Sequence, residues 1–273
     1  MRLDPRGPLG CLFFFCGLVL SIIIFFAVLG IAIWRCPHAM AWQAKPSGGY
    51  SIGSPPWENN VSEICAQLLK ADSPWTPESV TGMLANVQGE GGMNPWRWQN
   101  DSYDPTHRMG YGLFGFTPAS KYIGNSIAVK LPGYGPNLST TTITTGASAR
   151  DGAAQVEFMN EGNVGWVSSC WRTYWDPDDY PELYQLRQSC LDRYGNGSTI
   201  SFNQFKECTD YADATFIFLA CFEGPAVPNY SARLNYAEQI APFVGASNRF
   251  PAWLLFAFRK GGIYHGIYNQ PLG

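Results

Sequence analysis

Apolar residues recur at helical spacing in two successive segments of this chain. The first segment predicts a helix over 59–70, with an apolar stripe formed by Val61, Ile64, Cys65, Leu68 and Leu69. The second segment predicts a helix that ends at Glu90, with a stripe formed by Val80, Met83, Leu84 and Val87. Thr76 suits the N-cap of this second helix and Pro77 suits its first turn. We therefore expect two amphipathic helices that face one core.

Three further segments carry helix signals. Residues 151–161 predict one helix, and a last helix is expected to open at Ser231. The segment 210–222 is apolar nearly all round after its capping residue, Asp210. Such a helix is typical of the buried centre of a helical domain.

The stretches between these helices are rich in turn residues. Segment 96–116 predicts irregular or strand-like structure, and segment 175–197 predicts mostly loop. Thr117-Pro118 predicts the start of a further helix. The pattern as a whole favours a mainly α fold, α+β in class, with a small irregular or β wing.

The N-terminal part of the chain is uncharged over the length of a membrane-spanning helix. No charge occurs from Gly7 to Trp34, and a spanning helix needs about 20 apolar residues. The stretch is longer than the apolar core of a cleaved signal peptide, roughly 7–15 residues. We therefore predict an uncleaved transmembrane signal anchor. The predicted organisation is a short cytoplasmic N-terminus at 1–8, the anchor at 9–34, a linker at 35–56, a folded domain at 57–245 and an apolar tail at 246–273.

The charge distribution bears on partners and on orientation. The net charge is −3 and the chain has no basic block, so the sequence does not predict nucleic-acid binding. Arg2 and Arg6 precede the predicted anchor, whereas Arg35 and Lys45 follow it. Together with the free amino group, this slight bias favours a cytoplasmic N-terminus. The folded domain is then expected on the extracytoplasmic side of the membrane.

Cysteine usage agrees with an exported domain. Six cysteines lie outside the predicted anchor, namely Cys36, Cys65, Cys170, Cys190, Cys208 and Cys221. An even set indicates disulfides and an oxidising compartment, although the sequence does not choose among the pairings. The alternative is a set of buried thiols in a reducing compartment. No Cys-x-x-Cys pair occurs and the three histidines are scattered, so we predict neither a zinc site nor another cofactor.

Glu90 is the residue whose position suggests chemistry. It lies near Met83 on the helical wheel, at the rim of the apolar stripe and just before Gly91-Gly92. Partial desolvation raises the pKa of a carboxyl group, which suits a general acid. Cleavage of a glycosidic bond needs such an acid. The competing interpretation is an exposed carboxylate at a helix end, which is the usual place for glutamate.

Two sequence motifs surround Glu90. The first is Gly89-Glu90-Gly91-Gly92-Met93-Asn94-Pro95, and the second is Gly110-Tyr111-Gly112-Leu113-Phe114-Gly115. With these motifs the chain resembles the phage tail lysozyme family and, more distantly, goose-type lysozymes and lytic transglycosylases. Phe222-Glu223-Gly224-Pro225 and Arg233 resemble the closing helices of that family. The resemblance covers about residues 57–245 and implies a lysozyme-like fold.

The resemblance implies that Glu90 is the catalytic acid. Asp101, eleven residues further along in the facing loop, is the candidate for a second carboxylate, and Asp104 competes with it. If neither faces the cleft, Glu90 would act alone, as in lytic transglycosylases, and would leave a 1,6-anhydro sugar. The candidate substrate-binding residues are Asn94, Gln99, Tyr111, Gly112 and Phe116. Gln155 and Glu157 lie on one predicted helix and are further candidates to line the groove, and a solvated face is the favoured interpretation.

The predicted function is cleavage of the N-acetylmuramic acid–N-acetylglucosamine bond of peptidoglycan by a membrane-anchored hydrolase or lytic transglycosylase. Local wall opening would suit a virion, conjugation or secretion complex, whose subunits are possible partners. Two departures from the family favour an alternative. Gly91 replaces a common serine, and Gly115 replaces the glutamine of a Gly-Leu-x-Gln segment. The alternative is therefore an inactive wall-binding or structural assembly protein that kept the fold.

Overall fold

The structure is a computed structural model that describes residues 42–139, 147–162 and 165–249. The predicted cytoplasmic segment, the anchor at 9–34 and most of the predicted tail lie outside these ranges. Within these ranges, no helix combines the length and the apolar character that crossing a bilayer requires.

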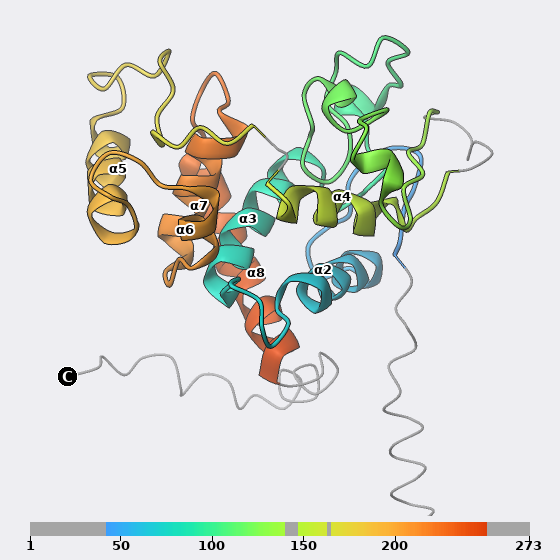
Figure 1. The fold of residues 1–273 in the computed structure, drawn as a ribbon, viewed down its shortest axis with the longest axis horizontal. Coiled ribbons are helices and arrows are strands. Elements are labelled where there is room, and N and C mark those ends of the chain that lie inside the picture. Colours follow the sequence, from blue (N-terminus) through green and yellow to red (C-terminus); the bar gives the residue numbers. More distant parts are fainter. Residues whose placement is uncertain (1–41, 140–146, 163–164, 250–273) are drawn as a thin grey trace, which may run out of the picture. The chain divides into compact units, whose positions relative to one another are not determined.

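The described chain is mainly helical, as the sequence pattern predicts. Its α-helices are α2 (Pro55–Leu68), α3 (Pro77–Glu90), α4 (Asp151–Asn160), α5 (Pro181–Tyr194), α6 (Phe202–Lys206), α7 (Tyr211–Phe218) and α8 (Tyr230–Arg249) (Figure 1). Its shorter elements are the 3-10 helices η1 (Gln99–Asp101), η2 (Ala119–Lys121) and η3 (Ala128–Lys130), and a π-helix, η4 (Leu219–Glu223), that continues α7. Among the described residues, β pairing is limited to isolated bridges from Tyr111 to Trp98 and to Phe116. The predicted wing is therefore a looped region.

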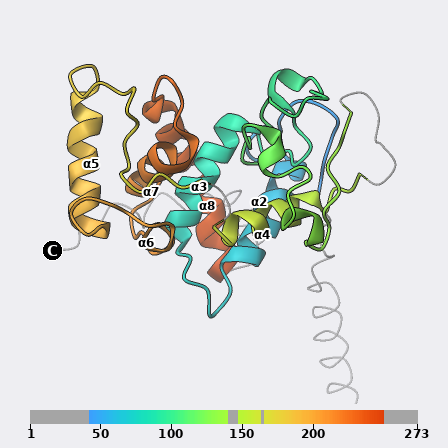
Figure 2. The same ribbon diagram turned by 45° about the horizontal axis from the view of Figure 1, so that its top comes forward.

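Helix α3 forms the centre of the helical packing, and α7 and α8 lie along it (Figure 1 and Figure 2). Every side chain from Ser79 to Val87 is buried, so α3 is covered on all sides and not only along its apolar stripe. Its first turn is held by a capping box, in which Thr76 Oγ1 accepts a hydrogen bond from the Ser79 amide at 3.0 Å. The other end of this rigid helix places Glu90.

The described part of the predicted linker packs against the domain. Trp42 is buried in the core, and the Gln43 amide donates to Asn60 Oδ1 at 2.8 Å. The Tyr50 amide donates to the Gly92 carbonyl at 2.7 Å, next to the end of α3. Residues 42–54 thus support the turn that follows Glu90.

Two local predictions are wrong. The segment predicted as loop at 175–197 contains α5, a helix that buries only Cys190 and Leu191. With so little of its surface buried, α5 has no extended apolar stripe for a sequence pattern to detect. The helix predicted at Thr117-Pro118 is only the single turn of η2, which begins after a cis Thr117-Pro118 bond.

The structure assigns one disulfide among the candidate cysteines. Cys170 and Cys221 are bonded, and they link the segment before α5 to the π-helix η4. Cys190 and Cys208 are buried thiols, Cys65 is buried in the core, and Cys36 lies outside the described residues.

Reduction of this disulfide is expected to destabilise the protein. The bond joins residues 51 positions apart in sequence. Closing a loop of that length lowers the entropy of the unfolded chain by an amount equivalent to about 4 kcal/mol. Urea unfolding should shift to lower urea when a reductant is added to the wild type. The same reductant should leave the midpoint of Cys221→Ala unchanged, and an equal shift in both proteins would contradict the assignment.

Candidate active site

Glu90 is the last residue of α3, and its side chain is 36% exposed. The chain turns at once through Gly91, which passes close to the opposite loop. A Cβ atom on Gly91 would lie 2.8 Å from the carbonyl oxygen of Gly112. The serine that is common at this position in the family therefore does not fit here, and the departure follows from the close approach of two backbones.

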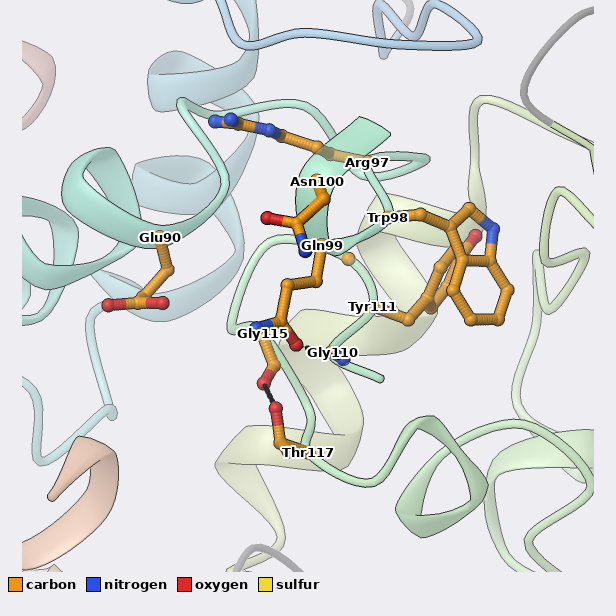
Figure 3. Close-up of a pocket in the computed structure, with 10 residues that line it drawn as sticks. Glu90, Arg97, Trp98, Gln99, Asn100, Gly110, Tyr111, Gly115 and Thr117 are labelled. Atoms are coloured by element: carbon orange, nitrogen blue, oxygen red, sulfur yellow. Dashed lines mark hydrogen bonds between the residues drawn. The ribbon is translucent and has the colours of Figure 1, made fainter. Parts of the chain in front are cut away.

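Glu90 forms one side of a cleft of about 280 Å³. The cleft is lined by Glu90, Arg97, Trp98, Gln99, Asn100, Gly110, Tyr111, Gly112, Gly115 and Thr117. Figure 3 shows Glu90 across from Gln99, Asn100 and Gly115. The facing wall is thus polar and rich in glycine, a surface that can hydrogen-bond the hydroxyl and amide groups of a sugar chain.

A narrow loop pairing builds this facing wall. The Gln99 amide donates to the Gly110 carbonyl at 2.9 Å, and the Gly110 amide donates back to Gln99 Oε1 at 3.0 Å. Gly115 has a φ of +55°, which strains any residue with a side chain, and its Cβ position lies 3.4 Å from Glu90 Cβ. The backbone conformation therefore accounts for Gly115 in place of the family's glutamine. As a result, position 115 places no side chain beside Glu90.

A buried polar cluster supports the wall from behind. The Asp151 carboxylate accepts hydrogen bonds from Tyr111 Oη at 3.0 Å, Tyr122 Oη at 2.6 Å, Gln155 Nε2 at 2.8 Å and the Gly135 amide at 2.9 Å. Burial raises the pKa of Asp151, and burial also raises the pKa of Tyr111 and of Tyr122. Both hydroxyls therefore keep their protons and donate to the carboxylate.

The sequence analysis missed this support. Gln155 is fully buried, which corrects its placement on a solvated face. Its side chain accepts from the Leu113 amide at 2.7 Å and donates to the Pro95 carbonyl at 2.7 Å. The spacing of four residues between Asp151 and Gln155 on one helix was the available signal, because residues so spaced share a face.

The predicted substrate-binding residues separate into two groups. Gln99 and Gly112 line the cleft. Tyr111 borders it, but its side chain is fully buried and its hydroxyl is bonded to Asp151, so the predicted stacking of this ring on a sugar is not available here. Asn94 and Phe116 are buried and do not line it. The Asn94 amide donates to the Lys45 and Gly48 carbonyls, so its hydrogen bonds hold residues 45–48 in place.

Neither candidate for a second carboxylate lines this cleft. Asp101 Oδ1 accepts from the Gly48 amide at 2.6 Å and lies 3.3 Å from Arg97 Nε. Asp104 accepts hydrogen bonds within its own turn, chiefly from the Thr106 hydroxyl, and these hold the pKa of its carboxyl well below the usual range. Among the residues that line the cleft, Glu90 is the carboxylate.

Arg233 of α8 holds the Glu90 side chain. Its Nη2 donates to Glu90 Oε1 at 2.5 Å. The guanidinium lies directly against Gly89, where a Cβ atom would be only 1.1 Å from Arg233 Nη1. A side chain at position 89 would therefore have to displace the guanidinium of Arg233.

A second glutamate lies in the same cluster. Glu223 ends η4, and burial raises the pKa of its carboxyl well above the usual range, with the charge of Glu90 adding to the effect. Arg233 and Arg172 act in the opposite direction. The sequence analysis used Glu223 and Arg233 only as marks of resemblance, because a separation of more than 130 residues from Glu90 hides their proximity.

Gly89→Ala is expected to displace Arg233 and to lower both stability and activity. Replacing glycine by alanine inside a helix normally stabilises a protein by about 0.5–1 kcal/mol, so the predicted sign is opposite to the usual one. Thermal unfolding would measure the effect. In an Arg233→Ala background the same change should become stabilising, because the guanidinium is gone. A higher melting temperature for the single variant would contradict the placement of Arg233.

Comparison with known proteins identifies the family of this chain. The family model for the phage tail lysozyme matches residues 59–243. The chain is also similar to morphogenesis protein 1 of Bacillus phage B103, with 28% identity over 165 residues. That match covers 60% of this chain and 34% of the phage protein, so the chain spans about a third of its relative. Because the family match extends over more than half of the sequence, the chain belongs to the phage tail lysozyme family.

Proposed function

We propose that this protein cleaves the β-1,4 bond between N-acetylmuramic acid and N-acetylglucosamine in peptidoglycan, with Glu90 as the general acid. The observation that carries the proposal is the position of Glu90, partly exposed at the end of a rigid helix and facing a polar cleft. Membership of a family of lysozyme-like domains supports the substrate class. Glu90 would donate its proton to the glycosidic oxygen as the bond breaks.

The cleft favours a mechanism with one carboxylate. Asp101 and Asp104 are held by other partners, so Glu90 would also have to accept the proton of the attacking hydroxyl. The internal C6 hydroxyl of N-acetylmuramic acid can serve as that nucleophile without a second carboxylate to position a water molecule. We therefore propose a lytic transglycosylase reaction that leaves a 1,6-anhydro end.

We further propose that the reaction takes place next to a membrane. The apolar segment 9–34 would anchor the protein in a membrane, with the domain on the extracytoplasmic side and close to the wall. The similarity to a phage morphogenesis protein favours a virion complex over a conjugation or secretion apparatus.

Analysis of the reaction products tests the proposed function. Purified peptidoglycan would be digested with the full-length protein in mild detergent, and the soluble fragments identified by mass spectrometry before and after borohydride reduction. We expect 1,6-anhydro-N-acetylmuramic acid ends, which borohydride leaves unchanged. Reducible N-acetylmuramic acid ends would instead assign ordinary hydrolysis. Binding to peptidoglycan without release of fragments would support the alternative of an inactive wall-binding protein.

A further inference from the structure

Two buried polar atoms beside Glu90 have no hydrogen-bond partner among the described residues. One is the acceptor Oε1 of Glu223, and the other is the donor Nε of Arg233. Leaving a buried polar group unsatisfied costs about 1–3 kcal/mol. The two atoms are complementary in kind and belong to one electrostatic cluster. Their common location calls for an explanation that involves both residues.

Three charged side chains act on the Glu223 carboxyl. The groups that act on Glu223 are Glu90 at the end of α3, Arg233 on α8 and Arg172 from the segment before α5. Arg172 is committed to backbone, because it donates to the Ala220 and Phe222 carbonyls at 2.8 Å each. Arg233 pairs with Glu90 and keeps a buried donor, Nε, without a partner among the described residues, so it has a donor left for Glu223.

We infer that Arg233 is shared between Glu90 and Glu223, and that Glu223 is a positioning residue which takes the guanidinium when Glu90 holds the catalytic proton. The inference rests on the proposed function. In the arrangement seen here, Arg233 pairs with Glu90 and Glu223 Oε1 has no partner among the described residues, so we assign the proton of the cluster to Glu223. In the reactive arrangement Arg233 pairs with an ionised Glu223, and the proton lies on Glu90.

The proton balance of the reaction is complete with these three residues. Glu90 gives its proton to the glycosidic oxygen as the bond from C1 to that oxygen breaks. The attacking hydroxyl forms the new bond to C1 and gives its proton to the Glu90 carboxylate, from which the proton returns to Glu223. Arg233 then pairs again with Glu90, and the cluster holds one proton, as it did at the start. No further acid or base is required.

The test is the pH dependence of cleavage by the full-length Glu223→Gln variant. Glutamine has the same shape but cannot become a charged partner, so Arg233 remains on Glu90 and opposes its protonation. As the pH rises, the variant should therefore lose its activity at a pH about one unit or more below that at which the wild type does. Its activity should return on acidification. In Arg233→Gln, the pH at which activity is lost should instead be higher than in the wild type. Glu182→Gln, on the exposed side of α5, is the control and should leave the profile unchanged.

A profile of unchanged shape with a lower plateau would assign Glu223 a structural role and overturn the inference. A shift of the Glu223→Gln limb to higher pH would also overturn it. A measurement that needs no catalytic activity distinguishes failure of this inference from failure of the proposed function. At neutral pH the infrared difference spectrum between the wild type and Glu223→Gln should show the band of a protonated carboxyl that the variant lacks, because other buried carboxyls such as Asp151 cancel in the difference. If the difference spectrum lacked that band, the sharing of Arg233 would be overturned even if the protein proved inactive.

Discussion

Replacing Glu90 by glutamine is expected to lower the rate of peptidoglycan cleavage by about 10²–10⁴-fold, the range that general acid–base catalysis contributes. Glutamine keeps the oxygen that accepts the hydrogen bond from Arg233 but has no acidic proton to donate. The fold should therefore persist while the reaction stops. Release of dye from labelled cell walls by the full-length protein would measure the rate.

Glu161→Gln is the matched control for this prediction. Glu161 follows α4 at the surface and does not line the cleft, so its replacement should leave the rate unchanged. The melting temperature of Glu90→Gln should lie close to that of the wild type. A variant that stays folded and retains more than about a tenth of the wild-type rate would contradict the role of Glu90 as general acid.

Replacing Asp151 by alanine is expected to reduce the free energy of unfolding by at least about 3 kcal/mol, because each buried donor left unsatisfied costs about 1–3 kcal/mol. Three side chains and one backbone amide donate to this carboxylate. Tyr111 would lose its anchor, so the cleft wall should also loosen and the rate should fall. Urea unfolding followed by tryptophan fluorescence would measure the change.

Asp151→Asn separates the hydrogen bonds from the volume of the side chain. Asparagine keeps one acceptor oxygen in the same shape, so its destabilisation should lie between the wild type and Asp151→Ala. Equal losses for the two variants would mean that the hydrogen bonds to Asp151 do not stabilise the wall.

The helices that place Glu90 could be predicted because hydrophobic spacing and capping residues act locally. Thr76 and the stripe of α3 predicted the course of that helix and its end at Glu90. Helix α7 was detected because its apolar surface is continuous, whereas α5 was missed because little of it is buried. Prediction succeeded where burial leaves a periodic pattern and failed where a helix lies on the surface.

The cleft was harder to predict, because loop geometry decides which side chains face it. Asp101 follows Glu90 closely in sequence, but Asn100 and Asp101 both have positive φ, and the carboxylate turns to the Gly48 amide. Asn94 was placed in the cleft from its motif, although its amide bonds hold residues 45–48. Arg233 and Glu223 reach Glu90 only through the tertiary packing of α8 and η4 on α3. No local pattern encodes that proximity.

The measurement that tests the central claim most directly is a crystal structure of the Glu90→Gln variant with a peptidoglycan tetrasaccharide. The account predicts that the sugar chain lies across the cleft between residue 90 and the Gln99–Asn100 wall. The glycosidic oxygen between N-acetylmuramic acid and N-acetylglucosamine should then accept a hydrogen bond from the side-chain amide of the introduced glutamine, at about 2.6–3.2 Å. A tetrasaccharide bound elsewhere, or with no glycosidic oxygen within reach of residue 90, would contradict the account.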